Sequence, residues 1–237
     1  MEERLARIGA LVGEKSLQKL ANLRIIIFGV GGVGSVCAES LIRSGVCNLT
    51  MVDSDVVVES NINRQLPALN STLGCPKVEV LRERFLDINP GAEIVALQAR
   101  YSAETREQFV FKNYDVVIDA IDSLSPKTDL LVTASEAGCR VFCSLGAAGK
   151  LDPTKVRTSS IWETTGCPLG KLVRNGLRKR EFHGDFMAVY SQEPSLLKGM
   201  AGEPVVLGSA MPVTATFGLA LSSLVIRYAV ALERQNC

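Results

Sequence analysis

Short apolar runs alternate with longer mixed stretches along the first two thirds of the chain. The run Arg24–Phe28 is rich in β-branched residues and ends at glycines, which is typical of a parallel strand buried on both faces. The same pattern predicts strands at 24–28, 48–52, 93–97, 114–119 and 140–144, with helices between them at 34–43, 76–88, 104–111 and 125–137. Alternating strands and helices predict an α/β fold, a doubly wound and mostly parallel Rossmann-like sheet.

The pattern changes after Gly149. We predict strands at 155–161 and 186–191, a helix at 168–180 and a mobile loop at 192–204, which contains two glycines and two prolines. We interpret the whole chain, 1–237, as one domain. Its predicted parts are an N-terminal helical arm (1–22), a central core (23–149) and an elaboration (150–237) on the substrate side and at a dimer interface.

The segment 204–226 carries no charge and is long enough to span a bilayer. It also contains Pro212, two glycines and several hydroxyl side chains. This composition favours a buried strand followed by an apolar helix in the core or at a dimer interface. A membrane segment remains the alternative.

The composition is globular, with 47% apolar and 22% charged residues in 237 positions. A formal net charge of +1 restricts any nucleic-acid site to a local patch. There are seven cysteines, an odd number, with no C-x-x-C pair, and the first residues are polar with mixed charge. We therefore expect a cytoplasmic protein with neither a disulfide framework nor a signal peptide.

A glycine-rich turn follows the first predicted strand and opens the first core helix. It reads Gly29-Val30-Gly31-Gly32-Val33-Gly34. Glycines let the backbone approach phosphate oxygens, and the N–H groups of a helix start attract negative charge. Asp53 ends the second strand, near the spacing at which an acid meets a ribose hydroxyl. This combination predicts a nucleotide site, although a tight turn without a ligand has the same glycines.

Two cations and an acid follow the turn and bear on which nucleotide it binds. The turn alone does not separate NAD from ATP. Arg64 and Lys77 would offset the charge that develops when a triphosphate is attacked at its α-phosphorus. Asp122 follows a predicted strand and would face the ligand crevice, where it could bind Mg²⁺. Each cation taken alone is equally consistent with solvated surface charge.

These residues belong to motifs that resemble the E1-like adenylating superfamily, which includes the ThiF, MoeB and HesA enzymes. The chain is most similar to its tRNA threonylcarbamoyladenosine dehydratase branch, the TcdA or CsdL type. The matching motifs are Gly29–Gly34, Asp53-Ser54-Asp55, Asn61–Gln65, Pro76-Lys77, Asp119–Ser123 with Pro126-Lys127, Gly146–Thr154, Cys167-Pro168-Leu169, Tyr190–Pro194 and Gly208-Ser209.

The resemblance implies a role for each of these residues. The expected cofactor-binding residues are Gly29, Gly31, Gly32, Gly34, Asp53, Asp55, Asn61, Arg64, Gln65, Lys77 and Asp122. Asp53 would bind the ribose of ATP, and Asn61, Arg64 and Lys77 its phosphates, while Asp122 would position Mg²⁺ and the α-phosphate. Arg7 resembles the arginine that superfamily members contribute to the ATP site of a partner subunit, which implies a homodimer. The expected catalytic set is Arg64, Lys77, Asp122 and Arg7.

The implied reaction is the ATP-dependent cyclisation of N6-threonylcarbamoyladenosine in tRNA through a carboxyl-adenylate. A monovalent cation and a sulfur-relay accessory protein are further expectations. The chain departs from MoeB and ThiF because it lacks two C-x-x-C pairs, so we expect no zinc site. Many superfamily members have Asp-Asn followed by an arginine at the positions where this chain has Asp122-Ser123 and Lys127. The form in this chain is the dehydratase-like one.

Ring closure within one nucleoside needs no protein nucleophile, because proximity supplies the advantage. Cys167, before a helix start, is the best candidate for a reactive thiol, and a small helix-flanking residue is the other interpretation. His183 lies in a polar stretch and is interpreted as a surface residue. The candidate tRNA contacts are Lys171, Arg174, Arg178, Lys179 and Arg180, which would also fit a solvated helix face.

Two other functions remain open at this stage. One is adenylation of the C-terminus of a ubiquitin-like sulfur-carrier protein, as in MoeB and ThiF. The other is an NAD-binding regulatory or redox module.

Overall fold

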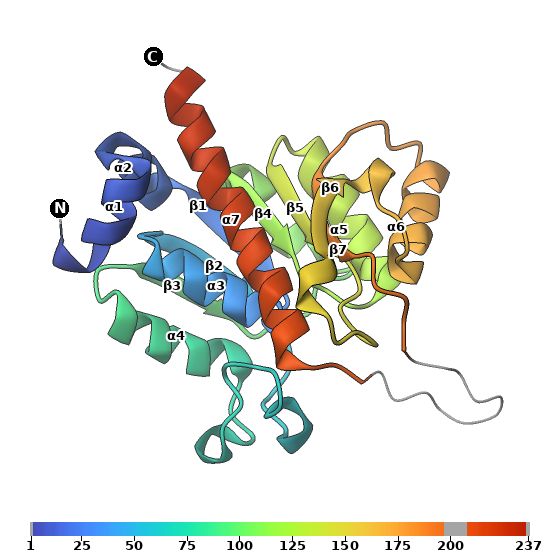
Figure 1. Cartoon of the computed structure of the whole chain (residues 1–237), viewed down its shortest axis with the longest axis horizontal. Coiled ribbons are helices and arrows are strands. Elements are labelled where there is room, and N and C mark those ends of the chain that lie inside the picture. The colour runs from blue at the N-terminus through green and yellow to red at the C-terminus, as the bar shows by residue number, and fades with distance from the viewer. Residues whose placement is uncertain (1, 197–207, 236–237) are drawn as a thin grey trace.

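The computed structural model describes residues 2–196 and 208–235 and contains a seven-stranded sheet with the order β3-β2-β1-β4-β5-β7-β6 (Figure 1). All neighbouring strands are parallel except β6 and β7, which are antiparallel. The strands are β1 (Arg24–Phe28), β2 (Asn48–Val52), β3 (Glu93–Leu97), β4 (Val116–Asp119), β5 (Arg140–Ser144), β6 (Val156–Ser160) and β7 (Met187–Ser191). The predicted doubly wound, mostly parallel sheet is confirmed.

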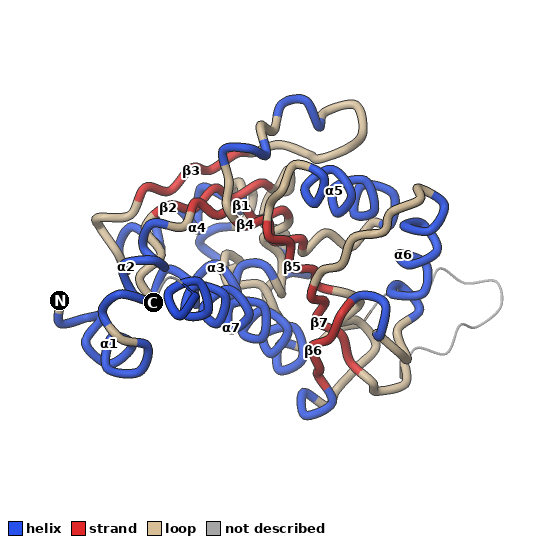
Figure 2. The backbone as a smooth tube through the Cα atoms, turned by 90° about the horizontal axis from the view of Figure 1, so that it is seen from above, coloured by secondary structure: helices blue, strands red, loops and turns tan. Residues whose placement is uncertain are grey.

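Helices cover both faces of the sheet, as the view from above shows (Figure 2). They are α1 (Ala6–Val12), α2 (Glu14–Asn22), α3 (Gly34–Arg43), α4 (Lys77–Ile88), α5 (Leu124–Glu136), α6 (Pro168–Lys179) and α7 (Met211–Gln235). Successive side chains of β1 divide between two cores. Ile25 and Ile27 pack with α3, α4 and α7, whereas Ile26 and Phe28 pack with α5 and α6. Burial on both faces explains why β1 is apolar at every position after the exposed Arg24.

The strand order reverses between β1 and β4, which are neighbours in the sheet but not in the sequence. In an open parallel sheet, the loops beyond the carboxyl ends of such strands diverge to opposite faces and leave a crevice. The glycine turn follows β1 and Asp122 follows β4, so both lie at this switch point.

The apolar C-terminal segment forms α7, which crosses the sheet beside α3 (Figure 1). Residues 211–233 are long and apolar enough to span a membrane, which is also true of many core helices. Val213, Phe217, Leu221 and Val225 are fully buried in the α3 side of the core. Packing within the fold therefore accounts for much of its apolar character. We expected a strand before this helix. Residues 208–210, which directly precede α7, form no strand, and the earlier part of the expected strand lies outside the described residues.

The helix predicted at 104–111 is wrong. Only short 3-10 turns occur there, at Arg106–Gln108 and Phe111–Asn113. Phe109 and Phe111 are both buried, and their rings contact Phe28 together with Tyr101. Two aromatic side chains that are two residues apart cannot share one face of an α-helix, so tertiary packing of these rings determines the backbone.

The N-terminal arm is helical, as predicted, but it is divided. A 3-10 turn at Glu3–Leu5 leads into α1, and Gly13 separates α1 from α2. The φ of Gly13 is 84°, a left-handed value that glycine adopts without strain. The mobile loop expected at 192–204 falls largely on residues 197–207, which lie outside the described part of the chain.

We expect Gly218→Ala to destabilise the fold through the contact between α7 and α3. A Cβ atom at Gly218 would lie 2.5 Å from the carbonyl oxygen of Val33. Overpacking costs about 2 kcal/mol at the centre of its usual range, and the better helix propensity of alanine offsets about 1 kcal/mol, so we expect a net loss of about 1 kcal/mol in urea unfolding. Gly91→Ala, whose Cβ would have only a 3.7 Å neighbour, is the control. Equal stability of the two variants would contradict this packing.

Candidate functional site

The glycine turn packs directly against the turn that follows β4. A Cβ atom on Gly34 would lie 1.9 Å from the carbonyl oxygen of Gly29, and one on Gly29 would lie 2.8 Å from that of Ala120. Gly29 also has a φ of 85°. A side chain at Gly29 would separate the two turns, and a side chain at Gly34 would disrupt the glycine turn itself, so both positions require glycine. The approach also brings the backbone before α3 beside the segment that leads to Asp122.

Asp53 connects the carboxyl end of β2 to the glycine turn. Its Oδ2 accepts a hydrogen bond from the Val30 amide at 2.8 Å, and its Oδ1 accepts one from the Asp55 amide at 2.9 Å. The side chain is only partly buried, so the carboxylate has acceptor capacity left for a ligand hydroxyl. This position fits the ribose contact that the resemblance implies.

Lys77 is the first residue of α4 and bends toward β2. Its ammonium lies 2.8 Å from the Asp55 carboxylate, and its backbone amide donates to the Asp55 carbonyl at 3.1 Å. The lysine side chain is 5% exposed, whereas that of Asp55 is 65% exposed. The ion pair therefore fixes a buried cation at the start of α4, close to the segment that follows β2.

A tight turn carries Asn61, Arg64 and Gln65 into the same region. The Asn61 carbonyl accepts hydrogen bonds from the amides of Arg64 and Gln65, and its buried side chain accepts from the Val58 amide at 3.3 Å. A Cβ atom on Gly32 would lie 3.3 Å from the Arg64 side chain. The Arg64 guanidinium donates to the Ser60 carbonyl and to the Asn63 side chain, at 2.9 and 2.8 Å.

Gln65 provides a test of whether a nucleotide fits. Its side chain lies against Gly31, 3.6 Å from where a Cβ atom would be. Within the described part of the chain, its Oε1 is the one buried side-chain N or O atom without a hydrogen-bond partner. A buried amide with an unused polar end, next to a glycine that has no side chain, matches a site that receives a polar ligand.

Asp122 lies in the exposed turn between β4 and α5. No hydrogen bond or ion pair of its carboxylate occurs among residues 2–196 and 208–235. In those ranges no three His, Cys, Asp or Glu side chains gather where they could bind a metal ion together. A Mg²⁺ ion at Asp122 would therefore need phosphate oxygens and water for its other ligands.

Arg7 is not brought to this site within one chain. Its neighbours Ile8 and Leu11 line a cavity of about 560 Å³ together with Ile226 and Val230 of α7. The glycine turn meets the other end of α7, at Thr214. A helix rises about 1.5 Å per residue, so roughly 24 Å of α7 separates the two ends.

The ThiF family model matches residues 3–231 of this chain. The chain belongs to the ThiF family. A tRNA threonylcarbamoyladenosine dehydratase of Bacillus subtilis is 40% identical over 197 residues, which are 83% of this chain and 78% of that protein. The dehydratase of the same name from Haemophilus influenzae is 36% identical, and the match covers 95% of this chain and 92% of that protein.

Solved structures place this ThiF-family chain in the same group. The crystal structure of Escherichia coli tRNA N6-threonylcarbamoyladenosine dehydratase, TcdA, in complex with ATP has a TM-score of 0.90 and 32% identity. The match covers 99% of this chain and 97% of that one. In contrast, an Escherichia coli sulfur carrier protein ThiS adenylyltransferase is 32% identical over 131 residues, 51% of this chain.

Beneath the site of this ThiF-family chain lies a charged cluster that the sequence interpretation missed. Asp119 and Lys127 are both fully buried, with 2.5 Å between Oδ2 and Nζ. Burial alone lowers the pKa of Lys127, but the charge of Asp119 raises it overall above its ordinary value. Cys143 donates its S–H to Asp119 at 3.2 Å, and burial raises the pKa of this thiol. The sequence contains one hint of this cluster, an acid that ends an apolar strand with a lysine eight positions later, but the pairing itself depends on how α5 packs on β4.

Cys167, the candidate reactive thiol, is buried at the start of α6. Its sulfur accepts a hydrogen bond from the Gly170 amide at 3.4 Å, so it caps the helix. This contact favours the helix-flanking interpretation of Cys167. His183 is exposed, which fits its interpretation as a surface residue.

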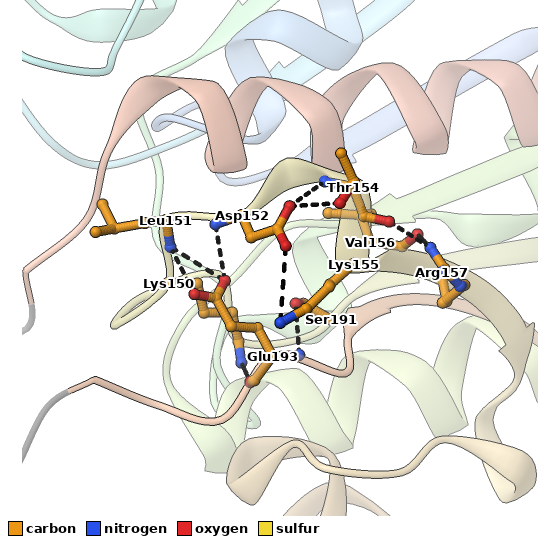
Figure 3. A network of polar contacts seen from close by, with 9 residues as sticks. All are labelled: Lys150, Leu151, Asp152, Thr154, Lys155, Val156, Arg157, Ser191 and Glu193. Carbon is orange, nitrogen blue, oxygen red and sulfur yellow. Dashed lines mark hydrogen bonds and ion pairs between the residues drawn. The ribbon is translucent and has the colours of Figure 1, made fainter.

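Two motifs of the family resemblance, Gly146–Thr154 and Tyr190–Pro194, meet in a polar network (Figure 3). The buried Glu193 carboxylate accepts hydrogen bonds from the amides of Leu151 and Asp152, at 3.1 and 2.9 Å. Lys150 is also buried and donates to the Glu193 carbonyl. We call these contacts the Glu193 clasp. It joins the loops that follow β5 and β7, at the carboxyl edge of the sheet.

The basic helix α6 exposes most of its candidate tRNA contacts. Lys171, Arg178, Lys179 and Arg180 are exposed, whereas Arg174 is half-buried and donates to the buried Thr164 hydroxyl. The Arg178 guanidinium lies 5.5 Å from the ring centroid of Trp162, an aromatic neighbour that the sequence interpretation missed. None of the five basic residues forms an ion pair within the described ranges.

We expect Glu193→Gln to destabilise this ThiF-family chain by about 2 kcal/mol. A buried hydrogen bond to a charged group contributes about 1.5–3 kcal/mol, and the neutral amide weakens two of them. Urea unfolding measures the loss. Glu163→Gln, at an exposed glutamate, is the matched control and should change stability by less than about 0.5 kcal/mol. A Glu193→Gln variant as stable as its control would show that the clasp contributes nothing.

Proposed function

We propose that this chain is an ATP-dependent tRNA threonylcarbamoyladenosine dehydratase. The observation that carries the proposal is the set of nucleotide-binding side chains assembled around a turn that only glycine permits, at the switch point of the sheet. Relatives with this name are similar over nearly the whole chain, and an ATP complex of one has the same fold. Adenylation of a carrier protein is the weaker candidate, because the ThiS adenylyltransferase match covers only half of the chain.

A carboxylate is a poor electrophile, so the enzyme must first convert it to a mixed anhydride. The threonine carboxylate of the modified nucleoside attacks the α-phosphorus of ATP, pyrophosphate leaves, and a carboxyl-adenylate forms. Arg64, beside Gly32 of the turn, and Lys77, held by Asp55, would offset the negative charge that develops on the phosphates. Asp53 binds the ribose. Asp122 would bind Mg²⁺, which supplies further neutralisation of phosphate charge.

The second step closes a ring within the substrate. A nitrogen of the same modification attacks the activated carbonyl and loses its proton, and AMP leaves with one oxygen of the original carboxylate. The substrate thereby loses the elements of water. No protein thiol is required, because the attacking atom is already tethered to its target. The structural roles of the two thiols near the site support this route, since Cys167 caps a helix and Cys143 donates to Asp119 in the core.

Two copies of the chain complete the site in this proposal. Arg7 lies at the far end of α7 from its own glycine turn, so it would act in the site of a partner subunit. Leu11 on the same helix is 81% exposed, an apolar surface that a second copy would cover. The proposed enzyme is a cytoplasmic homodimer, with α7 packed in the fold rather than inserted in a membrane.

The decisive experiment is mass spectrometry of tRNA nucleosides after incubation with the protein, ATP and Mg²⁺. We expect N6-threonylcarbamoyladenosine to be converted to its cyclised form with release of AMP. Asp122→Ala should reduce turnover at least about 100-fold, because it removes the acid proposed to position metal and α-phosphate. Asp87→Ala, at an exposed acid on α4, should stay within about twofold of the wild type. Turnover on a carrier protein without tRNA would refute this function.

The exposed face of α6 is proposed as the tRNA contact. We expect Lys171→Gln with Arg178→Gln to weaken tRNA binding about tenfold. The slope of log K against log salt should fall in magnitude by about 1.5, because binding without these two charges displaces fewer counterions from the RNA. Filter binding at several salt concentrations measures both quantities. Lys19→Gln with Lys112→Gln, which removes two exposed charges elsewhere, should leave affinity and slope unchanged. Equal losses in both double variants would show that no local RNA surface exists on α6.

A further inference from the structure

The buried pair of Asp119 and Lys127 is unusual because both side chains are completely shielded from water. Removing two charges from water is costly, and an apolar pair of similar volume is often as stable or more stable. Stability alone therefore gives a weak reason for charges at this place. Neither group can contact ATP or RNA directly, since neither has any exposed surface.

The position of the pair suggests what it does. While Oδ2 of Asp119 pairs with Lys127, Oδ1 accepts a hydrogen bond from the Ile121 amide at 3.0 Å. Ile121 directly precedes Asp122, so one carboxylate connects the buried lysine to the backbone that presents Asp122. The same backbone is fixed from another side, because the Ala120 amide donates to the Phe28 carbonyl at 2.8 Å.

Lys127 also anchors the far side of this turn. It lies in the first turns of α5, and its amide donates to the Ser123 carbonyl at 3.2 Å. The turn of residues 120–123 is thus bounded by β4 on one side and α5 on the other, and the ion pair joins the two elements beneath it. Cys143 of β5 adds a thiol hydrogen bond to the same carboxylate oxygen.

We propose that Asp119 and Lys127 form a positioning pair for catalysis. The ammonium orients the Asp119 carboxylate, the carboxylate fixes the Ile121 amide, and the amide fixes Asp122 in the crevice. This inference rests on the proposed function, because it assigns the pair a role in placing Asp122 for Mg·ATP. It also explains why a charged pair is present where an apolar one would suffice for packing.

The test compares an apolar and a polar replacement of the pair. Asp119→Leu with Lys127→Met removes both charges and the acceptor for the Ile121 amide. We expect a folded protein that binds Mg·ATP at least tenfold more weakly, by calorimetric titration, and turns over at least 30-fold more slowly. Asp119→Asn with Lys127→Met restores an acceptor for the Ile121 amide, so it should turn over at least tenfold faster than the Leu/Met variant. A folded Leu/Met variant with wild-type binding and turnover would overturn the proposal.

A second comparison separates positioning from a general structural effect. If the pair acts through Asp122, adding the Leu/Met replacement to Asp122→Ala should lower turnover by less than about twofold further. Losses that multiply instead would overturn the proposal. Should the Leu/Met variant fail to fold, the Asn/Met variant decides: we expect threefold to tenfold weaker Mg·ATP binding than the wild type, and wild-type binding would refute the idea.

Asp129→Asn is the matched control. Asp129 lies on the same helix and is buried, but it pairs with Tyr101 and Arg106, on the aromatic side of α5. It should keep wild-type Mg·ATP affinity and turnover, and a loss equal to that of the Leu/Met variant would contradict positioning. If the wild type itself formed no cyclised nucleoside, the proposed function would fail, whereas the Mg·ATP titrations would still test the pair.

Discussion

The contact between the glycine turn and the turn after β4 is the constraint on which the site depends. A Cβ atom at Gly29 would collide with the carbonyl oxygen of Ala120, so these two segments can approach only because glycine has no side chain there. A Cβ atom at Gly34 would collide with the carbonyl oxygen of Gly29, so the turn itself also needs glycine at that position. This approach brings the start of α3, the end of β2 through Asp53 and the segment leading to Asp122 to one edge of the sheet. Residues widely separated in sequence therefore become neighbours through backbone geometry before any side chain takes part.

Much of this arrangement could be predicted from the sequence. The strands β1, β2, β3 and β5 were predicted with the bounds that the structure gives. β1, β2 and β5 are buried at four of their five positions, as expected for parallel strands covered on both faces, whereas β3 is a partly exposed edge strand. The prediction failed at 104–111, where Phe109 and Phe111 pack on Phe28 from another strand, a tertiary contact that local periodicity does not contain.

The candidate site divides in a similar way. Motif spacing indicated Asp53, which follows β2, and Lys77, which begins α4. Arg64 lies in a turn between these elements, and the Asn61–Gln65 motif indicated it. The ion pair of Asp119 with Lys127 and the stacking of Arg178 on Trp162 depend on how helices pack on the sheet, so they became visible only in three dimensions. The expected role of Arg7 came from the family resemblance alone. In the structure, its neighbours Ile8 and Leu11 lie at the end of α7 that is far from the glycine turn.

The sheet ends at β6, the antiparallel strand bonded to β7, and the Glu193 clasp lies beside this end (Figure 3). Arg157 of β6 folds its guanidinium back onto the carbonyl oxygens of Thr154 and Val156, at 2.6 and 2.8 Å. These acceptors are occupied by the chain itself, and a charged side chain lies along the strand, a device that discourages strand-to-strand association. Growth of the sheet into a second molecule is thereby disfavoured at β6.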